Sequence, residues 1–129
     1  MKRDMDLIRD LLLRLESLPL ARHDVWVINA DDEQLRFDEY TVGQVDYHLS
    51  LLHEAGLIND GGAGSLTGYG FPRLSWEGHD LIDSVRDPEL WKKTKSGAMT
   101  AGGFTMKLIA DLAKGFLKKQ IEERTGVTL

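Results

Sequence analysis

The sequence predicts an α+β fold, and three observations carry this prediction. Apolar residues recur at helical spacing in the first 18 residues and again at 42–55. The second run ends in Gly56 and passes directly into the apolar pair Leu57 and Ile58, as a helix followed by a strand would. Five of the eleven residues at 60–70 are glycine, which is typical of a hairpin tip. The order helix, short strand, helix, hairpin, helix predicts a winged helix-turn-helix-like domain.

A first helix is predicted over residues 4–18. Asp4 is a suitable N-cap because its carboxylate accepts hydrogen bonds from the free N–H groups of a first turn, and Pro19 ends the run. The inward stripe would consist of Met5, Ile8, Leu11, Leu12, Leu15 and Leu18.

The stretch that follows is less regular. Residues 25–28 predict a short strand, and residues 29–33 predict a turn. Two alternatives remain open after the turn. Leu35 and Phe37 alternate with polar neighbours as in a second strand, whereas residues 32–35 also suit a one-turn helix.

The second long helix is predicted over 42–55, with Thr41 as its N-cap and Gly56 beyond its end. A strand at 57–59 and a return strand at 71–75 would then form the hairpin. The return strand contains a proline, which restricts it to the edge of a sheet.

Two further helix starts follow the hairpin. A serine caps a predicted helix at 76–85, and Asp87, with a proline and an acid behind it, caps a short helix that ends near Thr94. Trp76 and Trp91 lie in these two helices, and both are expected to bury against the first helix.

These elements define a winged-helix-like domain at 1–94, a Gly-rich linker at 95–103 and a C-terminal amphipathic helix within 104–129. The apolar half of this last helix consists of Met106, Ile109, Leu112, Ala113, Phe116, Leu117 and Ile121. Its own domain, a second copy or a membrane could cover that face. The linker argues against the first, and a polar face of mixed sign without tryptophan argues against the third. We therefore expect an association helix that forms a homodimer or binds a protein partner, without membrane contact.

Composition and charge bound the class of protein. The sequence contains no cysteine, which excludes disulfides, thiol catalysis and Cys-based zinc sites. No signal-peptide pattern and no membrane-spanning run is found, so a cytoplasmic protein is expected. Residues 1–91 carry 8 Lys and Arg against 18 Asp and Glu, and residues 92–129 carry 8 against 3. Any attraction to a nucleic acid must therefore come from this basic tail.

The helix at 42–55 would be the recognition helix of a helix-turn-helix protein. On a helical wheel its outward arc contains Gly43, Asp46, Tyr47, Ser50, His53 and Glu54. The candidate DNA contacts are Gln44, Tyr47, Ser50 and His53, with Arg73 in the wing and the basic tail on phosphates. Two residues of the arc are acids and none is Lys or Arg, which opposes binding to a phosphate backbone.

No catalytic residue, cofactor or metal site is predicted. The paired carboxylates lie in expected turns and on helix surfaces, where a solvated charge is the usual role. His48 and His53 are about 140° apart on a helix and cannot share a ligand face. His79 and Asp83, at i and i+4, would supply only half of a metal site, and a solvated pair is the favoured interpretation.

Two resemblances follow from these residues. His48, Leu49 and Leu52, with the run 54–57 (EAGL), resemble the recognition helix of small bacterial winged-helix repressors of the metal-sensor type, although the metal-binding cysteines of that family are absent. Over nearly the whole chain, a second set of segments resembles an uncharacterised family of short bacterial and prophage proteins. They are MKRDMDLIR at the start, YHL with EAGLI, LSWEGHD, and RDPE with WK. This resemblance implies a winged-helix-like fold and no assigned activity.

Two functional hypotheses follow. The first is a DNA-binding transcriptional regulator of bacterial or prophage origin, which is the usual function of the predicted fold. The second is a non-enzymatic protein–protein interaction module that keeps the winged-helix fold without binding DNA, and the acidic outward arc favours it.

Overall fold

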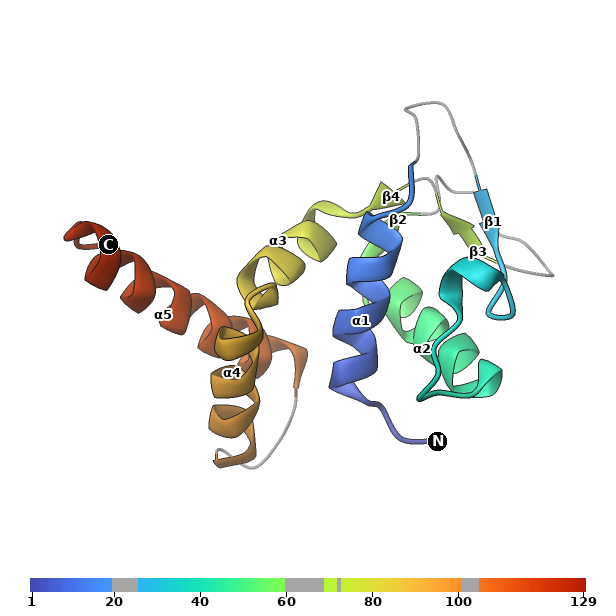
Figure 1. Cartoon of the computed structure of the whole chain (residues 1–129), viewed down its shortest axis with the longest axis horizontal. Helices are drawn as coiled ribbons and strands as arrows, with labels where there is room; N and C mark the ends of the chain where they lie inside the picture. Colours follow the sequence, from blue (N-terminus) through green and yellow to red (C-terminus); the bar gives the residue numbers. More distant parts are fainter. Residues whose placement is uncertain (20–25, 60–68, 72, 101–104) are drawn as a thin grey trace. The chain divides into compact units, whose positions relative to one another are not determined.

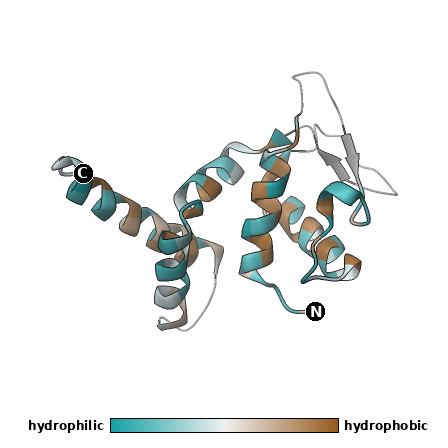
Figure 2. Cartoon of the chain, in the orientation of Figure 1, coloured by the Kyte–Doolittle hydropathy of each residue, from teal (hydrophilic) through white to brown (hydrophobic). Residues whose placement is uncertain are grey.

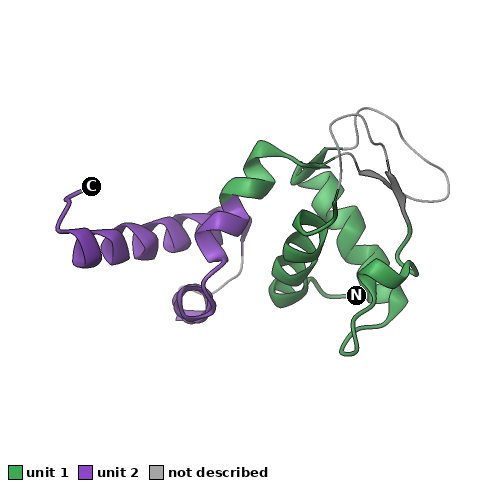
Figure 3. Ribbon diagram, turned by 45° about the horizontal axis from the view of Figure 1, so that its top comes forward, with its two compact units in different colours: residues 1–80 green, residues 81–129 purple. Residues whose placement is uncertain are grey.

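The computed structural model describes residues 1–19, 26–59, 69–71, 73–100 and 105–129. Within these ranges the fold is α+β, with five α-helices, one 3₁₀ helix and four short strands (Figure 1). The chain divides into two compact units, residues 1–80 and 81–129, which are described separately below (Figure 3).

Helix α1 (Met5–Glu16) forms the centre of the first unit. Asp4 is its N-cap, and the carboxylate Oδ1 accepts from the N–H of Asp6 at 2.9 Å and of Leu7 at 3.2 Å. Six of its twelve residues are buried, namely Met5, Leu7, Ile8, Leu11, Leu12 and Leu15. Each fully buried leucine or isoleucine contributes roughly 1.5–3 kcal/mol relative to an exposed position, so this helix is fixed by its apolar side.

The strands form two antiparallel ladders. Strand β1 (Trp26–Ile28) pairs with β3 (Tyr69–Phe71), with Trp26 opposite Phe71. Strand β2 (Ile58–Asn59) pairs with β4 (Arg73–Leu74), with Ile58 opposite Leu74. The predicted strand at 25–28 and the predicted hairpin strands are therefore confirmed, with small shifts at their ends. The expected glycine-rich tip lies largely outside the described residues.

A 3₁₀ helix, η1 (Glu33–Leu35), follows β1, so the one-turn helix is the correct alternative and the second strand is not. Arg14 of α1 holds this segment in place. Its Nη1 donates to the carbonyl oxygens of Gln34 at 2.8 Å and Arg36 at 3.3 Å. The guanidinium also lies 4.5 Å from the centre of the Phe37 ring. The alternation of Leu35 and Phe37 therefore reflects packing beside α1 and not strand geometry.

Helix α2 (Val42–Glu54) has both predicted ends. Thr41 and Gln44 form a capping box, in which each side chain accepts from the other residue's N–H, at 3.1 Å and 2.9 Å. Gly56 has a φ of 71°, which a glycine adopts without strain, and the chain then turns into β2. The buried side of the helix consists of Val45, His48, Leu49 and Leu52.

Helix α3 (Trp76–Val85) begins in very close contact with the residue before β2. Ser75 Oγ accepts from the Gly78 N–H at 3.0 Å and donates to the Gly56 carbonyl at 2.6 Å. A Cβ on Gly78 would overlap the Leu57 carbonyl oxygen and lie 3.1 Å from its carbonyl carbon. Only glycine therefore allows the first turn of α3 to sit on this backbone.

The expected burial of Trp76 is wrong, because its side chain is 78% exposed. The reason is the rotation of α3. Gly78 faces Leu57, and two residues correspond to about 200° of helix, so Trp76 points to the opposite side. Trp91 is buried, with 5% exposure; that it packs against the first helix stays a prediction.

The second unit consists mainly of α4 (Pro88–Thr100) and α5 (Met106–Thr125). The structure corrects the predicted linker, since residues 95–100 are helical; residues 101–103 lie outside the described chain. Gly97, which the sequence places in the linker, marks a close helix contact. A Cβ at this position would lie 3.3 Å from Leu112 Cδ1.

The predicted C-terminal helix is present as α5, and hydrophilic and hydrophobic residues alternate along its length (Figure 2). Thr105 caps it by accepting from the Leu108 N–H at 3.1 Å. Only Ile109 and Ala113 are buried among its twenty residues. None of the helices in the described ranges combines the length and the apolar character that spanning a membrane requires.

Candidate functional site

The exposed side of α2 carries most of the residues predicted to contact DNA. Tyr47 is 37% exposed and His53 is exposed, whereas Gln44 and Ser50 are half-buried. Arg73 lies on β4 and is exposed. Four of these five side chains thus share one helix, and the fifth lies on a strand of the hairpin. They differ in exposure and in the hydrogen bonds that they already make.

Two of the predicted contacts are already used inside α2. The Gln44 side-chain oxygen accepts from the Thr41 N–H at 2.9 Å as part of the capping box. The Ser50 hydroxyl donates to the Tyr47 carbonyl. To make a bidentate contact with a base edge, Gln44 would have to release its side-chain oxygen from the capping box. Tyr47 and His53 are the more exposed of the four side chains on α2.

The surface of the first unit is strongly acidic. Residues 1–80 carry 7 Lys and Arg against 15 Asp and Glu, and α2 adds exposed Asp46 and Glu54 without any Lys or Arg. The pKa of Tyr40 is affected by these carboxylates as well as by burial. Burial raises the pKa of Tyr40 to about 12, and the carboxylates of Asp4 and Asp10 add to the shift. Such a surface repels the phosphate backbone of a nucleic acid.

Asp10 belongs to the same acidic region. Burial raises the pKa of Asp10, Arg9 opposes the shift, and Asp6 and Glu39 reinforce it. Carboxylates from α1 and from the segment before α2 thus make Asp10 harder to ionise. The field of this region favours cations over anions.

His48 fixes α2 against the start of α1. Its Nε2 accepts from the Asp4 N–H at 2.8 Å, and its Nδ1 lies 2.7 Å from the Gln44 carbonyl oxygen. Because the N–H and the carbonyl have fixed roles, the ring must be the neutral Nδ1–H tautomer. The side chain is only 1% exposed, so His48 positions the helix and does not reach a ligand.

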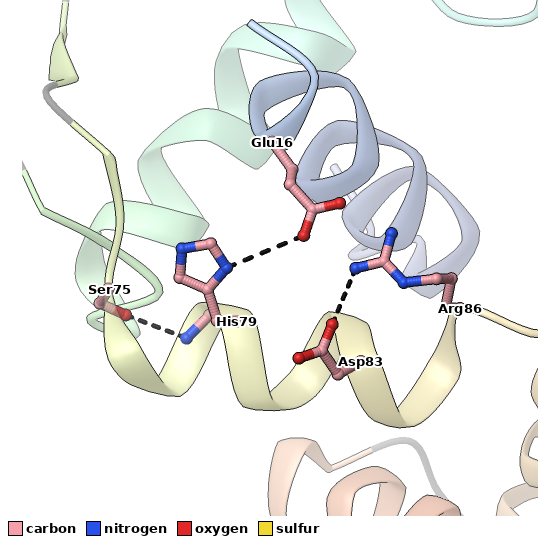
Figure 4. Close-up of polar contacts among 6 residues, drawn as sticks. Glu16, Ser75, His79, Asp83 and Arg86 are labelled. Atoms are coloured by element: carbon pink, nitrogen blue, oxygen red, sulfur yellow. Dashed lines mark hydrogen bonds and ion pairs between the residues drawn. The ribbon is translucent and has the colours of Figure 1, made fainter. Parts of the chain in front are cut away.

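The sequence suggests half of a metal site at His79 and Asp83, but these residues have other partners (Figure 4). His79 Nδ1 lies 3.8 Å from Glu16 Oε2 within the first unit. Asp83 accepts from Arg86 Nη2 at 2.8 Å within the second. Among the described residues, no three His, Asp or Glu side chains are grouped so that they could hold a metal ion.

Trp76 is the most exposed aromatic residue among those whose burial the structure describes, and its neighbours on α3 include acids. Glu77 and Asp80 are exposed, and Asp80 shares the face of Trp76 because it lies four residues further along the helix. We call Trp76, Glu77 and Asp80 the tryptophan face. A large exposed aromatic with a polar rim is typical of a protein-binding surface. The sequence analysis did not predict this exposed face. The signal that could have predicted it is Gly78, because a glycine in a first helical turn can allow close packing on its own side and so leave Trp76 on the opposite side.

A hollow of about 480 Å³ lies between η1 and the start of α2. Its walls are partly apolar, from residues such as Phe37 and Val45, and its lining includes Asp31, Asp38 and Arg36. One of its lining side chains, that of Thr41, already takes part in the capping box of α2.

In the second unit, α4 and α5 enclose a groove of about 380 Å³ with charges of both signs. It is lined by Glu89, Leu90, Lys93, Phe116, Lys119, Gln120, Glu123 and Arg124. Asp87 caps α4, and the N–H of Glu89 holds the pKa of this carboxyl below its usual value, with help from Gln120 and Arg124. The mixed charge is better suited to holding the two helices together than to binding an anion.

The residues predicted for association differ in their burial. Ile109 and Ala113 are buried within the second unit. The others remain half-exposed, namely Met106, Leu112, Phe116, Leu117 and Ile121. Part of the predicted association face is thus used inside the unit, and part stays accessible.

Comparison with known proteins assigns the chain to a family. The profile described as "Hypothetical protein (DUF2513)" matches residues 2–104. The chain belongs to this family. An "Uncharacterized protein" of Haemophilus influenzae is 39% identical over 98 residues, which cover 74% of this chain and 77% of that protein. No solved structure shows a significant match. The resemblance to a family of unknown function is therefore confirmed.

Proposed function

We propose that this chain is a non-enzymatic protein–protein interaction module built on a winged-helix-like first unit. The order of elements supports this fold, because α1, β1, η1, α2 and a hairpin follow one another as in a winged helix. The pairings support it too. β1 pairs with β3 and β2 pairs with β4, in two separate two-stranded antiparallel sheets, and the β2–β4 pair corresponds to the expected hairpin of the wing.

The observation that carries the interaction function is the exposure of Trp76, at 78%. Keeping a tryptophan in water forgoes roughly 1.5–3 kcal/mol of burial, so such a residue is favoured where a partner covers it. The α2 arc supports the same function, since its polar side chains are partly engaged and its charges are acidic. The lack of cysteine supports a reducing, cytoplasmic location.

DNA binding, as a transcriptional regulator of bacterial or prophage origin, is the second candidate. The observation in its favour is that Tyr47, His53 and Arg73 are exposed on α2 and β4, the elements that would meet a groove and its backbone. The charge of −8 on residues 1–80 opposes it.

A titration of the full chain with a random DNA duplex at low and high salt separates these functions. We expect no binding at low salt down to the roughly micromolar range typical of non-specific binders. Salt-dependent binding that weakens with Arg73→Gln, but not with Lys2→Gln at the exposed N-terminus, would overturn the interaction module and establish the DNA-binding function.

A further inference from the structure

A row of lysines on α5 complements the tryptophan face in charge. Lys107, Lys114 and Lys118 lie at i, i+7 and i+11, so they share one side of the helix, and all three are exposed. Two acids, Asp111 and Glu122, lie on the same side, so lysines outnumber acids there by three to two. We call them the lysine row. Lys107 lies 3.6 Å from Asp111, and both side chains remain well exposed.

An apolar stripe runs beside the lysine row. Ala110, Leu117 and Ile121 have the same i, i+7, i+11 spacing, three residues further along, and each is half-exposed. The buried residues Ile109 and Ala113 point about 60–100° away from the centre of this stripe, toward the rest of the unit. The stripe and the lysine row together present cations next to apolar surface.

We infer that the partner of the tryptophan face is a second copy of this chain, whose α5 places the lysine row and apolar stripe on Trp76, Glu77 and Asp80. The inference rests on the proposed interaction function and names its partner. Charge complementarity supports it, since residues 1–80 carry a net charge of −8 and residues 81–129 carry +3. Two identical faces would instead oppose like charges.

The chemistry of each contact is specific. A lysine ammonium is attracted to the face of an indole within about 6 Å, and carboxylates beside the ring bind the same cation. The chain already contains such a pair, with Lys95 Nζ 5.7 Å from the centre of the Trp91 ring. Leu117 and Ile121 would cover the remaining apolar surface of Trp76.

The test measures the mass of the full chain by sedimentation over a range of concentrations, for wild type and variants. We expect wild type to self-associate, and Trp76→Ala to raise the dissociation constant about thirtyfold, as the loss of an interface hot spot does. Lys114→Glu with Lys118→Glu should weaken association similarly. Met99→Ala is the matched control, since Met99 is also exposed, at 69%, but lies outside both faces.

A charge exchange makes the test decisive. Adding Glu77→Lys and Asp80→Lys to the chain that carries Lys114→Glu and Lys118→Glu should restore association, because each contact then regains opposite charges. A wild-type monomer at every concentration, or association that Trp76→Ala leaves unchanged, would overturn the inference. If the chain is a monomer and does not bind DNA, the dimer inference is wrong but the proposed interaction function is not contradicted. If the chain binds DNA, the proposed interaction function is contradicted, whether the chain is a monomer or a dimer.

Discussion

Helices α1 and α5 are both amphipathic in sequence, yet the structure uses them differently. α1 buries six of its twelve residues, whereas α5 buries two of its twenty. Both have an N-cap and a continuous apolar side, so local signals do not distinguish them. The difference shows that an apolar stripe predicts a helix reliably but does not predict what covers it. In α1 the stripe forms the core of its unit, and in α5 much of it remains accessible.

The largest expected effect tests this difference directly. Leu12→Ala in α1 removes a side chain with 0% exposure and should lower the free energy of unfolding by about 2–5 kcal/mol. Leu117→Ala in α5 is the matched change at a half-exposed position and should cost clearly less, about 1 kcal/mol or below. Urea denaturation of both variants gives the two values. Equal losses would mean that α5 is packed as firmly as α1.

The second prediction compares two glycines at close contacts. Gly78→Ala places a methyl group on the Leu57 carbonyl, which belongs to the backbone and cannot move aside, and should destabilise by about 1–3 kcal/mol or more. Gly97→Ala meets only the end of the Leu112 side chain, which can adjust. Thermal unfolding of the two variants should therefore show a much larger loss at Gly78. A smaller loss at Gly78 than at Gly97 contradicts the packing described for α3.

The third prediction has the opposite sign. Gly115 lies in α5, and a Cβ added there would meet no described atom within 4 Å, so Gly115→Ala should stabilise the chain by about 0.5–1 kcal/mol through helix propensity. Gly126 is the control, because its φ of 72° disfavours any other residue, and Gly126→Ala should not stabilise. A loss of stability in Gly115→Ala would show that another surface approaches α5 there, and its concentration dependence would identify a second copy.

The last prediction concerns alkaline pH and has no effect near neutrality. The pKa of Tyr40 is raised to about 12 from an ordinary value of 10.0, so the folded chain holds this proton more tightly than the unfolded chain. Its contribution to stability is complete below pH 10 and is lost as the pH rises toward 12. A phenolate absorbance titration should show a component near pH 12 that Tyr40→Phe removes. An unchanged titration curve would contradict the burial described for Tyr40 together with its acidic surroundings.

Local signals in the sequence predict the ends of the helices well. Asp4, Thr41, Ser75 and Asp87 cap their helices as expected, because a cap depends on residues within three positions along the chain. Gly56 likewise ends α2 with a positive φ. The α+β class follows from these ends and from the apolar periodicity between them.

Contacts between distant residues cannot be predicted in this way. His48 accepts from the Asp4 N–H across 44 positions, and no local pattern around His48 predicts this partner. Small residues at 95–103 predict a linker, but Gly97 is small because Leu112 lies against it. A glycine thus has opposite meanings in a linker and in a helix contact, and only the partner surface decides between them.

Gly78 has a consequence beyond stability. It has no functional group, yet its close contact with Leu57 fixes the rotation of α3 about its own axis. That rotation determines which side chains of the helix are exposed. A lineage that replaced this glycine would have to rotate the helix, and Trp76 would turn with it. Selection for an exposed Trp76 can therefore act on Gly78, a residue that contacts no partner.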